Sequence, residues 1–202
     1  MFMQKLLIAT HNPGKKREFA QLFAGLGFDI CTLDEVGITA EVEETGTTFA
    51  ENARLKAETY ARLSGLPTLA DDSGLEVAVL HGAPGVYSAR YGGVTGRAQL
   101  DYLLEQLEGV PFHQRLARFV CVIALVRPGG AVEYVEGTLL GVIEFEPKGS
   151  GGFGYDPLFY VVDDNMTLAE LSPERKNMIS HRAAAARAAR ELLVRWQAEA
   201  AL

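Results

Sequence analysis

The sequence predicts an α/β fold, a two-lobed mixed sheet flanked by helices. Short apolar runs alternate with helix-like spacings up to about residue 80, two long runs rich in Val, Ile and aromatic residues follow, and the chain ends in an alanine-rich stretch. A chain of 202 residues, 48% of them hydrophobic, suffices for a sizeable core, and it shows neither an internal repeat nor a long linker. We therefore expect residues 1–202 to form a single two-lobed domain.

The first part of the chain alternates between strand-like and helix-like segments. Breaks rich in Gly, Pro and Asn separate the segments, and Thr48 with Glu51 forms the capping box that starts a helix. The expected order is a strand at 5–10, a helix at 15–24, an extended segment at 30–33, a helix from 49 to about 63 and a short strand at 68–70. This last strand would deliver Asp71-Asp72-Ser73-Gly74 onto a turn.

The second part begins with a helix and then changes to longer strands. Pro128-Gly129-Gly130 separates two runs rich in Val and Ile, which predicts an antiparallel hairpin. The expected order is a helix at 98–107, strands at 116–126 and 131–145, a short strand at 158–162, helix starts at Thr167 with Glu170 and at Ser172 with Pro173, and a final helix at 180–201.

Charge and cysteine content exclude several classes of protein. The 19 Lys and Arg against 26 Asp and Glu give a net charge of -7, which argues against nucleic-acid partners, so any phosphate must be held locally. Cys31 and Cys121 lie far apart, so a disulfide framework or a zinc site is not indicated and a cytoplasmic location is the default. The longest apolar run, 119–126, is much shorter than the roughly 20 residues of a membrane span, and no secretion signal precedes the first strand.

The segment Thr10-His11-Asn12-Pro13-Gly14-Lys15 stands where a strand ends and a helix begins. Backbone N–H groups and the positive end of a helix dipole gather at such a place, and the lysine adds charge, so the segment is suited to phosphate. It matches neither the P-loop spacing nor the dinucleotide fingerprint. The alternative is a plain turn followed by solvated lysines.

Two acidic groups could serve a divalent cation. Glu41, Glu43 and Glu44 precede one helix, and Asp71-Asp72 follows an apolar strand at the position where α/β sheets place their ligands. Mg²⁺ in phosphate chemistry is usually held by one or two carboxylates and substrate oxygens. The alternatives are a solvated acidic loop and a tight turn capped by Asp.

The glycine-rich segment 149–157 could approach a ligand closely, with Phe153 and Tyr155 available to stack on a ring. A flexible hairpin loop with buried aromatic side chains is the alternative. Lys176 precedes Ser180-His181-Arg182, in which the serine could cap the last helix and the arginine could be solvated. His81 and His113 are expected at the surface, and Cys121 in the core.

In this order, the segments resemble the family of inosine/xanthosine triphosphate pyrophosphatases. The resemblance runs from Lys5 to about Leu193 and departs at His11, where relatives often carry glycine; a side chain is tolerable there if the backbone is not left-handed. The matching segments are Thr10-His11-Asn12-Pro13-Gly14-Lys15, Glu43-Glu44-Thr45-Gly46, Phe49-Ala50-Glu51-Asn52-Ala53, Ala70-Asp71-Asp72-Ser73-Gly74-Leu75, Gly82-Ala83-Pro84-Gly85-Val86-Tyr87-Ser88-Ala89-Arg90, Phe153-Gly154-Tyr155-Asp156-Pro157 and Ser180-His181-Arg182.

The resemblance implies hydrolysis of non-canonical purine nucleoside triphosphates, ITP, dITP, XTP and dXTP, to the monophosphate and pyrophosphate. It also implies a requirement for Mg²⁺, a homodimer and an active cleft between two lobes. The implied substrate-binding residues are Thr10, His11, Asn12, Pro13, Gly14, Lys15, Lys56 and Lys176 for the triphosphate, Ser73 for a further contact, and Phe153, Gly154, Tyr155, Asp156, His181 and Arg182 for the base. Asp72 is the implied general base and shares the metal with Glu43 or Glu44.

Physical chemistry is consistent with these implied roles. Beside a metal, Asp72 should keep a low pKa and orient a metal-activated water rather than act as a strong base alone. Hypoxanthine and xanthine carry a carbonyl where adenine carries an amino group, so a buried donor near Phe153, His181 or Arg182 would reject ATP. Three other functions stay open: a nucleotide sensor without turnover, a pyrophosphatase for modified pyrimidine nucleotides and, least favoured, a nucleic-acid-binding protein.

Overall fold

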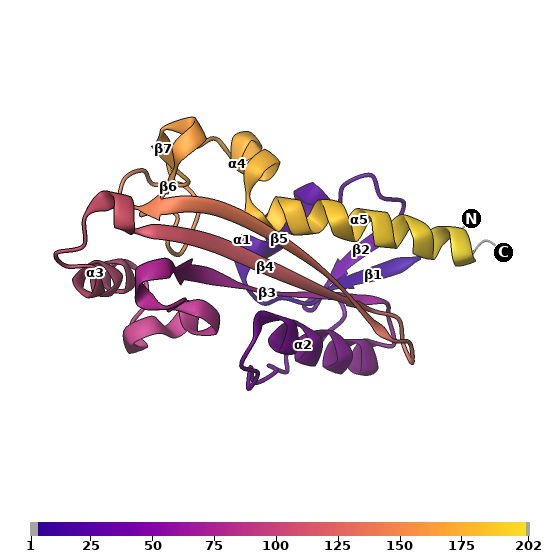
Figure 1. Cartoon of the computed structure of the whole chain (residues 1–202). Helices are drawn as coiled ribbons and strands as arrows, with labels where there is room; N and C mark the ends of the chain where they lie inside the picture. The colour runs from indigo at the N-terminus through magenta and orange to yellow at the C-terminus, as the bar shows by residue number, and fades with distance from the viewer. Residues whose placement is uncertain (1–3, 201–202) are drawn as a thin grey trace. The chain divides into compact units, whose positions relative to one another are not determined.

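A computed structural model of the chain describes residues 4–200 and has one seven-stranded sheet in the order β2-β1-β3-β4-β5-β6-β7 (Figure 1). The strands are β1 (Lys5–Ile8), β2 (Asp29–Thr32), β3 (Thr68–Val77), β4 (Leu116–Val126), β5 (Val132–Ile143), β6 (Phe159–Val161) and β7 (Met166–Thr167). The sheet is mixed, because β1 runs parallel to β2 and β3 whereas β6 runs antiparallel to β5 and β7. The predicted α/β class with a mixed sheet is confirmed.

Five α-helices occur in the described part of the chain, with short 3-10 turns between some of them. The helices are α1 (Pro13–Leu22), α2 (Phe49–Ser64), α3 (Arg97–Gln106), α4 (Pro173–Ile179) and α5 (His181–Ala200). The capping box of α2 forms as predicted, since the Thr48 side chain accepts from Glu51 N and the Glu51 side chain accepts from Thr48 N. Gly65 ends the same helix with a φ of 67°, in the left-handed region that glycine tolerates.

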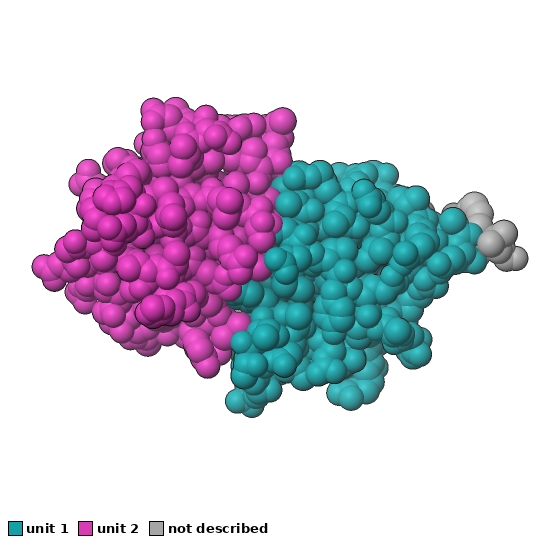
Figure 2. Space-filling model, in the orientation of Figure 1, with its two compact units in different colours: residues 1–72, 121–137, 182–202 teal, residues 73–120, 138–181 magenta. Residues whose placement is uncertain are grey.

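The chain divides into two compact units (Figure 2). Unit 1 comprises residues 1–72, 121–137 and 182–202, and unit 2 comprises residues 73–120 and 138–181. Strands β3, β4 and β5 therefore each contribute residues to both units. The single domain with a cleft between two lobes, expected from the sequence, stays a prediction.

Unit 1 buries apolar side chains on both faces of its strands. Leu6 and Ile8 of β1 pack with Phe19 of α1 and Trp196 of α5 in one cluster, whereas the intervening Leu7 points to the opposite face. Figure 1 shows α2 on the face opposite to α5. Alternation along each strand of unit 1 thus directs successive strand side chains to the α1/α5 face and to the α2 face in turn.

Unit 2 has its own core around α3. Leu100, Leu103 and Leu107 are buried against Leu75 of β3 and Phe159 of β6. The helix predicted at 98–107 is confirmed as α3, and so is the tight turn between β4 and β5, where Gly130 N donates to Arg127 O at 2.8 Å. His81 and His113 are exposed and Cys121 is buried, all as expected.

Two details of the predicted elements need correction. Strand β3 continues to Val77, so the turn predicted at Asp71-Asp72-Ser73-Gly74 is wrong; the strand lies between β1 and β4, and both carboxylates are buried beside cations. Thr167 N donates to Glu170 Oε2 at 2.8 Å, but this pair closes a turn rather than a helix. Ser172, which precedes Pro173, is extended with a ψ of 151° and starts α4 instead. Residue 201, the predicted end of the last helix, lies outside the described residues.

In the part of the chain that the structure describes, no helix combines the length and apolar character needed to cross a membrane. The 20-residue helix α5 lies instead against the core of unit 1, through Ala185, Ala189 and Leu193. Its alanines allow this close approach because they add little bulk between the helix and the strands.

Trp196 is expected to be a main anchor of α5. Its side chain is 2% exposed, and its indole Nε1 donates to Glu133 Oε1 at 2.7 Å. Replacing Trp196 by Ala should lower the free energy of unfolding by about 3–5 kcal/mol, measured by urea denaturation, because it leaves a large cavity. Val194→Ala on the same helix is the control. Because Val194 is 55% exposed, this substitution should change the free energy of unfolding by no more than about 0.5 kcal/mol. Equal effects of the two changes would contradict this packing.

Candidate active site

Two neighbouring carboxylates of β3 lie in opposite environments within unit 1. Asp71 faces α1 and α5, and its Oδ2 lies 2.7 Å from Lys15 Nζ and 3.9 Å from Arg182 Nε. Asp72 faces α2, where Asn52 Nδ2 donates to its Oδ2 at 3.1 Å and Lys56 Nζ lies 3.6 Å from its Oδ1. The alternation of side chains along a strand causes this separation.

Asp71 is a buried counter-ion. Burial alone would raise its pKa, but the charges of Lys15, Arg182 and Lys56 outweigh burial and hold the pKa well below its usual range. Arg182 is 2% exposed and also pairs with Glu18. The alternative in which Arg182 is a solvated residue is therefore wrong, because its guanidinium is the buried partner of two carboxylates.

Asp72 behaves differently from its neighbour. Burial raises its pKa above the usual value, and the nearby Lys56 and Lys15 only partly oppose this effect. The low pKa expected for Asp72 assumed an adjacent metal; in the protein alone, burial has the larger effect. Lys56 is partly buried, with 13% of its side chain exposed, and the carboxylates of Asp72, Asp71 and Glu44 raise its pKa against the effect of burial, so it stays charged. A base with a raised pKa takes a proton more readily near neutral pH.

The acidic loop before α2 supplies the second carboxylate to this cluster. Glu44 Oε1 accepts a hydrogen bond from Lys56 Nζ, so Glu44 and Asp72 flank the same ammonium group. Glu43 is exposed. The structure thus brings Glu44, and not Glu43, next to Asp72. Among the residues described, no three His, Cys, Asp or Glu side chains form a cluster that could hold a metal by themselves. Mg²⁺ is usually held by one or two carboxylates together with oxygens of a substrate phosphate. The pair of Glu44 and Asp72 suits such a site better than a metal site made of protein ligands alone.

The segment from Thr10 to Lys15 forms the strand-to-helix loop that the sequence predicts. Asn12 is the N-cap of α1, and its Oδ1 accepts from Gly14 N at 2.8 Å and Lys15 N at 3.1 Å. Pro13 occupies the first turn of the helix. Thr10 Oγ1 accepts from Asn12 N at 3.2 Å. The loop is ordered by its own side chains, and its binding of phosphate stays a prediction.

The departure at His11 is accommodated by the backbone. His11 is not among the described residues with a positive φ, so a side chain fits there without strain. Its ring meets the Tyr60 ring edge-on with centroids 6.2 Å apart, and its Nε2 lies 3.4 Å from Ala40 O. The condition set by the sequence, a backbone that is not left-handed, is met.

The glycine-rich loop of unit 2 is tied to a buried ion pair. Asp156 Oδ2 accepts from Phe153 N at 2.8 Å and from Lys176 Nζ at 2.7 Å, and that Nζ lies 4.9 Å from the centroid of the Phe153 ring. Gly152 has a φ of 71°, and a Cβ there would come within 2.0 Å of Asp156 Oδ2. These contacts argue against the alternative of a flexible hairpin loop.

The remaining predicted residues of unit 2 have different environments. Tyr155 is 3% exposed and its hydroxyl donates to Ser88 O at 3.2 Å, so its ring belongs to the core and burial raises its pKa. His181 is buried, with its ring stacked on Phe119 at 4.6 Å. Gly154 is exposed and Ser73 is half-buried in β3. Of the two aromatic residues expected to stack on a ligand, only Phe153 is partly accessible.

Sequence reasoning missed one side chain of the cluster around Asp72. Asn52 is fully buried, and it bonds both Asp72 and the loop, since its Oδ1 accepts from Gly46 N at 2.8 Å. A signal for it is present, because Asn52 and Lys56 are four residues apart and share one face of α2. Glu18, the second partner of Arg182, is separated from it by 164 residues, and no local pattern could have shown that pair.

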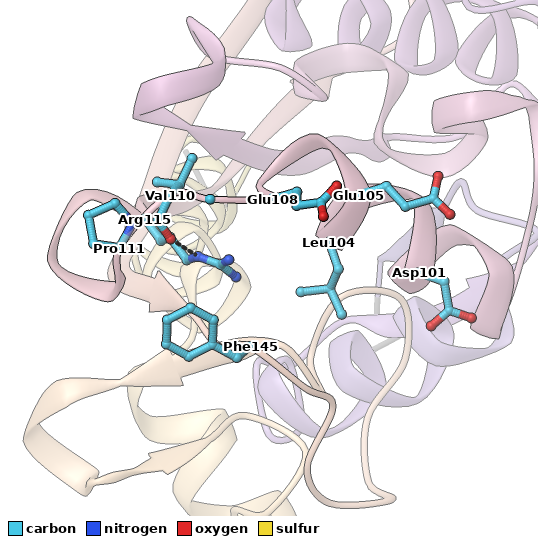
Figure 3. Close-up of a pocket in the computed structure, with 9 residues that line it drawn as sticks. Asp101, Leu104, Glu105, Glu108, Val110, Pro111, Arg115 and Phe145 are labelled. Carbon is cyan, nitrogen blue, oxygen red and sulfur yellow. Dashed lines mark hydrogen bonds between the residues drawn. The ribbon is translucent and has the colours of Figure 1, made fainter.

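A separate cavity of about 670 Å³ lies in unit 2 and contains none of the predicted site residues (Figure 3). Arg115 forms part of its wall, with its guanidinium 4.1 Å from the centroid of the Phe145 ring. Three guanidinium nitrogens of Arg115 donate to backbone carbonyls of Val110, Glu144 and Leu107. This arginine therefore has a structural role, and Asp101, Glu105 and Glu108 line the opposite side (Figure 3).

Comparison with known proteins gives a consistent result over nearly the whole chain. Residues 6–192 match the Ham1 family. The chain is 47% identical over 195 residues to the dITP/XTP pyrophosphatase of Bacillus subtilis (strain 168), covering 96% of this chain and 98% of that protein. It is 52% identical over 186 residues to the dITP/XTP pyrophosphatase of Escherichia coli O157:H7, covering 89% and 93%. A solved structure of a HAM1 protein from Coxiella burnetii aligns with a TM-score of 0.87 at 42% identity, covering 96% of this chain and 100% of that chain.

Lys56 is expected to keep the pKa of Asp72 from rising further. Its ammonium favours the ionised carboxylate, so Lys56→Met should raise the pKa of Asp72, measured by carboxyl ¹³C NMR titration of the metal-free protein. Lys16→Met is the control, since Lys16 pairs with Asp34 on the surface and should leave the pKa of Asp72 unchanged. An unchanged Asp72 titration in Lys56→Met would contradict the coupling.

Proposed function

Because the chain belongs to the Ham1 family, we propose that it is a dITP/XTP pyrophosphatase, which hydrolyses non-canonical purine nucleoside triphosphates to the monophosphate and pyrophosphate and so removes them from the nucleotide pool. Its identity to the relatives of that name, 47% to 52%, extends over nearly the full length of both chains. The observation that carries the proposal in the structure is the cluster of Asp72, Lys56 and Glu44 next to the loop that begins α1.

Mg²⁺ is the proposed cofactor, and Asp72 and Glu44 would hold it. The fit rests on the donor set, because the carboxylates of Glu44 and Asp72 both contact the ammonium group of Lys56 and so already attract a cation. When bound, Mg²⁺ would neutralise phosphate charge and act as a Lewis acid. Glu43 is the less favoured ligand, because it is exposed and has no described contact with this cluster.

The chain's own residues divide the reaction between them. Lys15, Lys56 and the N–H groups at the start of α1 would bind the triphosphate and stabilise the charge that develops on the departing pyrophosphate. Water attacks the α-phosphorus, the α–β anhydride bond breaks, and the proton of the water goes to the Asp72 carboxylate. Asp72 suits this role by its position beside Lys56 and Glu44, whereas Asp71 is paired with Lys15 and Arg182 on the other face of the strand.

Residues of unit 2 would recognise the base. Phe153 would stack on the purine, and the pair of Lys176 with Asp156 fixes the backbone and the ring of that loop. Lys176 is buried in this pair, which favours a role beside the base over the contact with triphosphate that the sequence resemblance implied. Donors from His181 or loop N–H groups would meet the 6-carbonyl of hypoxanthine or xanthine, and adenine would leave them unpaired. Arg182, whose guanidinium is buried with Asp71 and Glu18, is less suited to this contact than the sequence resemblance implied.

We also propose that the protein is a homodimer. Large apolar side chains of unit 2 are exposed in the single chain, among them Leu140 at 74% and Phe145 at 56%. A second copy covering such a surface would stabilise both chains by removing apolar area from water. Light scattering coupled to size exclusion should give twice the mass of one chain; the mass of one chain would contradict the dimer.

The direct test of the function is pyrophosphate release. Purified protein with Mg²⁺ should release pyrophosphate from dITP and XTP and act at least about 10²-fold more slowly on dATP, since unpaired donors penalise adenine. A chelator should abolish release. Nucleotide binding without any release would instead support a sensor, and a preference for modified pyrimidine triphosphates would support the other pyrophosphatase class.

Phe153 is expected to contribute to binding of every purine to a similar degree. Stacking of a base on an aromatic ring contributes about 1–3 kcal/mol, so Phe153→Ala should lower kcat/KM for dITP roughly 5- to 150-fold. The same factor should apply to dATP, because stacking does not read the edge of the base. Tyr134→Ala, which removes an aromatic ring on a residue that is 45% exposed, is the control and should leave kcat/KM unchanged. A change in the dITP to dATP ratio on removal of Phe153 would contradict a pure stacking role.

A further inference from the structure

Asn52 connects the two segments that carry the proposed metal ligands. It lies in α2 with none of its side chain exposed, and it is the only buried asparagine among the described residues. Its amide contacts Asp72 of β3 on one side and Gly46 of the acidic loop on the other. Burial of an amide costs free energy unless its polar atoms are bonded, and here both the donor and the acceptor have partners.

The partners fix which way the amide points. The N–H of Gly46 can only donate, so the amide oxygen of Asn52 faces it, at 2.8 Å. The amide NH₂ must then face the carboxylate of Asp72, where Nδ2 lies 3.1 Å from Oδ2. With Oδ2 held by this donor, Oδ1 is the oxygen directed toward Lys56 Nζ, at 3.6 Å. The hydrogen bond from Asn52 and the ion pair with Lys56 thus give the two oxygens of the Asp72 carboxylate different partners.

The contact with the loop is equally close. A Cβ on Gly46 would lie 2.7 Å from Asn52 Oδ1 and 2.7 Å from Glu51 Cβ, so only glycine permits this approach. Gly46 is two residues from Glu44, which contacts the same lysine as Asp72. The amide of Asn52 therefore holds Asp72 and the backbone beside Glu44 in one arrangement.

We propose that Asn52 is a positioning residue for the hydrolysis reaction, acting through the carboxylate of Asp72. This inference rests on the proposed function. Asn52 does not need to touch the substrate; it keeps Asp72 Oδ2 bonded and so presents the carboxylate in the orientation in which it receives the proton from water. Misplacing a reacting group by about 1 Å can cost roughly 10²-fold in rate, which is the size of effect expected here.

Two substitutions separate the two contacts of the amide. Asn52→Leu has a similar shape and removes both hydrogen bonds, whereas Asn52→Asp keeps an acceptor for Gly46 N and loses the donor to Asp72. Both variants should lower kcat for dITP by roughly 10²-fold with KM changed by no more than about twofold. Full activity in Asn52→Asp would overturn the proposal, because the loop contact alone would then be sufficient. The same variant keeps the test decisive if Asn52→Leu fails to fold.

A double-mutant cycle tests whether the effect passes through Asp72. In an Asp72→Asn background, Asn52→Leu should change the single-turnover rate by no more than about twofold, because the group it positions is gone. An equal loss in both backgrounds would show that Asn52 has only a structural role. Binding of a non-hydrolysable dITP analogue, measured by calorimetry, should stay within about twofold of the unsubstituted protein; loss of binding would contradict a role in positioning alone.

Gln99→Leu is the matched control. It removes another buried amide, which donates to Ser88 O in unit 2, and it should lower the melting temperature without lowering kcat. Failure of the proposed function is recognised separately, because the unsubstituted protein would then release no pyrophosphate from dITP. Release by the unsubstituted protein together with unchanged kcat in both Asn52 variants would overturn the role of Asn52 alone.

Discussion

The alternation of side chains along β3 is the constraint on which the site depends. Asp71 and Asp72 are consecutive, both are buried, and a strand must direct them to opposite faces. The face toward α1 and α5 supplies Lys15 and Arg182 to the first carboxylate, and the face toward α2 supplies Lys56 and Asn52 to the second. Each layer of unit 1 thus receives one carboxylate and surrounds it with different chemistry.

The two environments lead to two different roles. Asp71 is held ionised by adjacent cations, and removing one partner of such a buried pair typically costs about 3–5 kcal/mol. Asp72 has a hydrogen bond and a more distant ammonium group, so burial dominates and its pKa rises. A carboxylate locked in ion pairs is suited to holding α1, α5 and β3 together, whereas one that can take up a proton is suited to chemistry.

Features encoded by neighbouring residues could be predicted from the sequence, and features that depend on distant ones could not. The capping box of Thr48 and Glu51 and the start of α4 at Ser172 are local, and both are confirmed. The continuation of β3 through Asp71 and Asp72 depends on neighbouring strands and on cations from other elements. The residue types of this segment favour a turn, so they predict the wrong local structure. The position of Glu44, rather than Glu43, beside Asp72 likewise depends on the contact with Lys56, twelve residues further along the chain.

The most direct test of this account compares the two neighbouring carboxylates. Asp71→Asn should lower the free energy of unfolding by roughly 3–5 kcal/mol, because it removes the buried carboxylate that pairs with both Lys15 and Arg182. Asp72→Asn should keep stability within about 1 kcal/mol and lower the rate of pyrophosphate release from dITP by about 10²–10⁴-fold. A stable Asp71→Asn protein, or an Asp72→Asn protein that hydrolyses dITP at the original rate, would contradict the division of roles along β3.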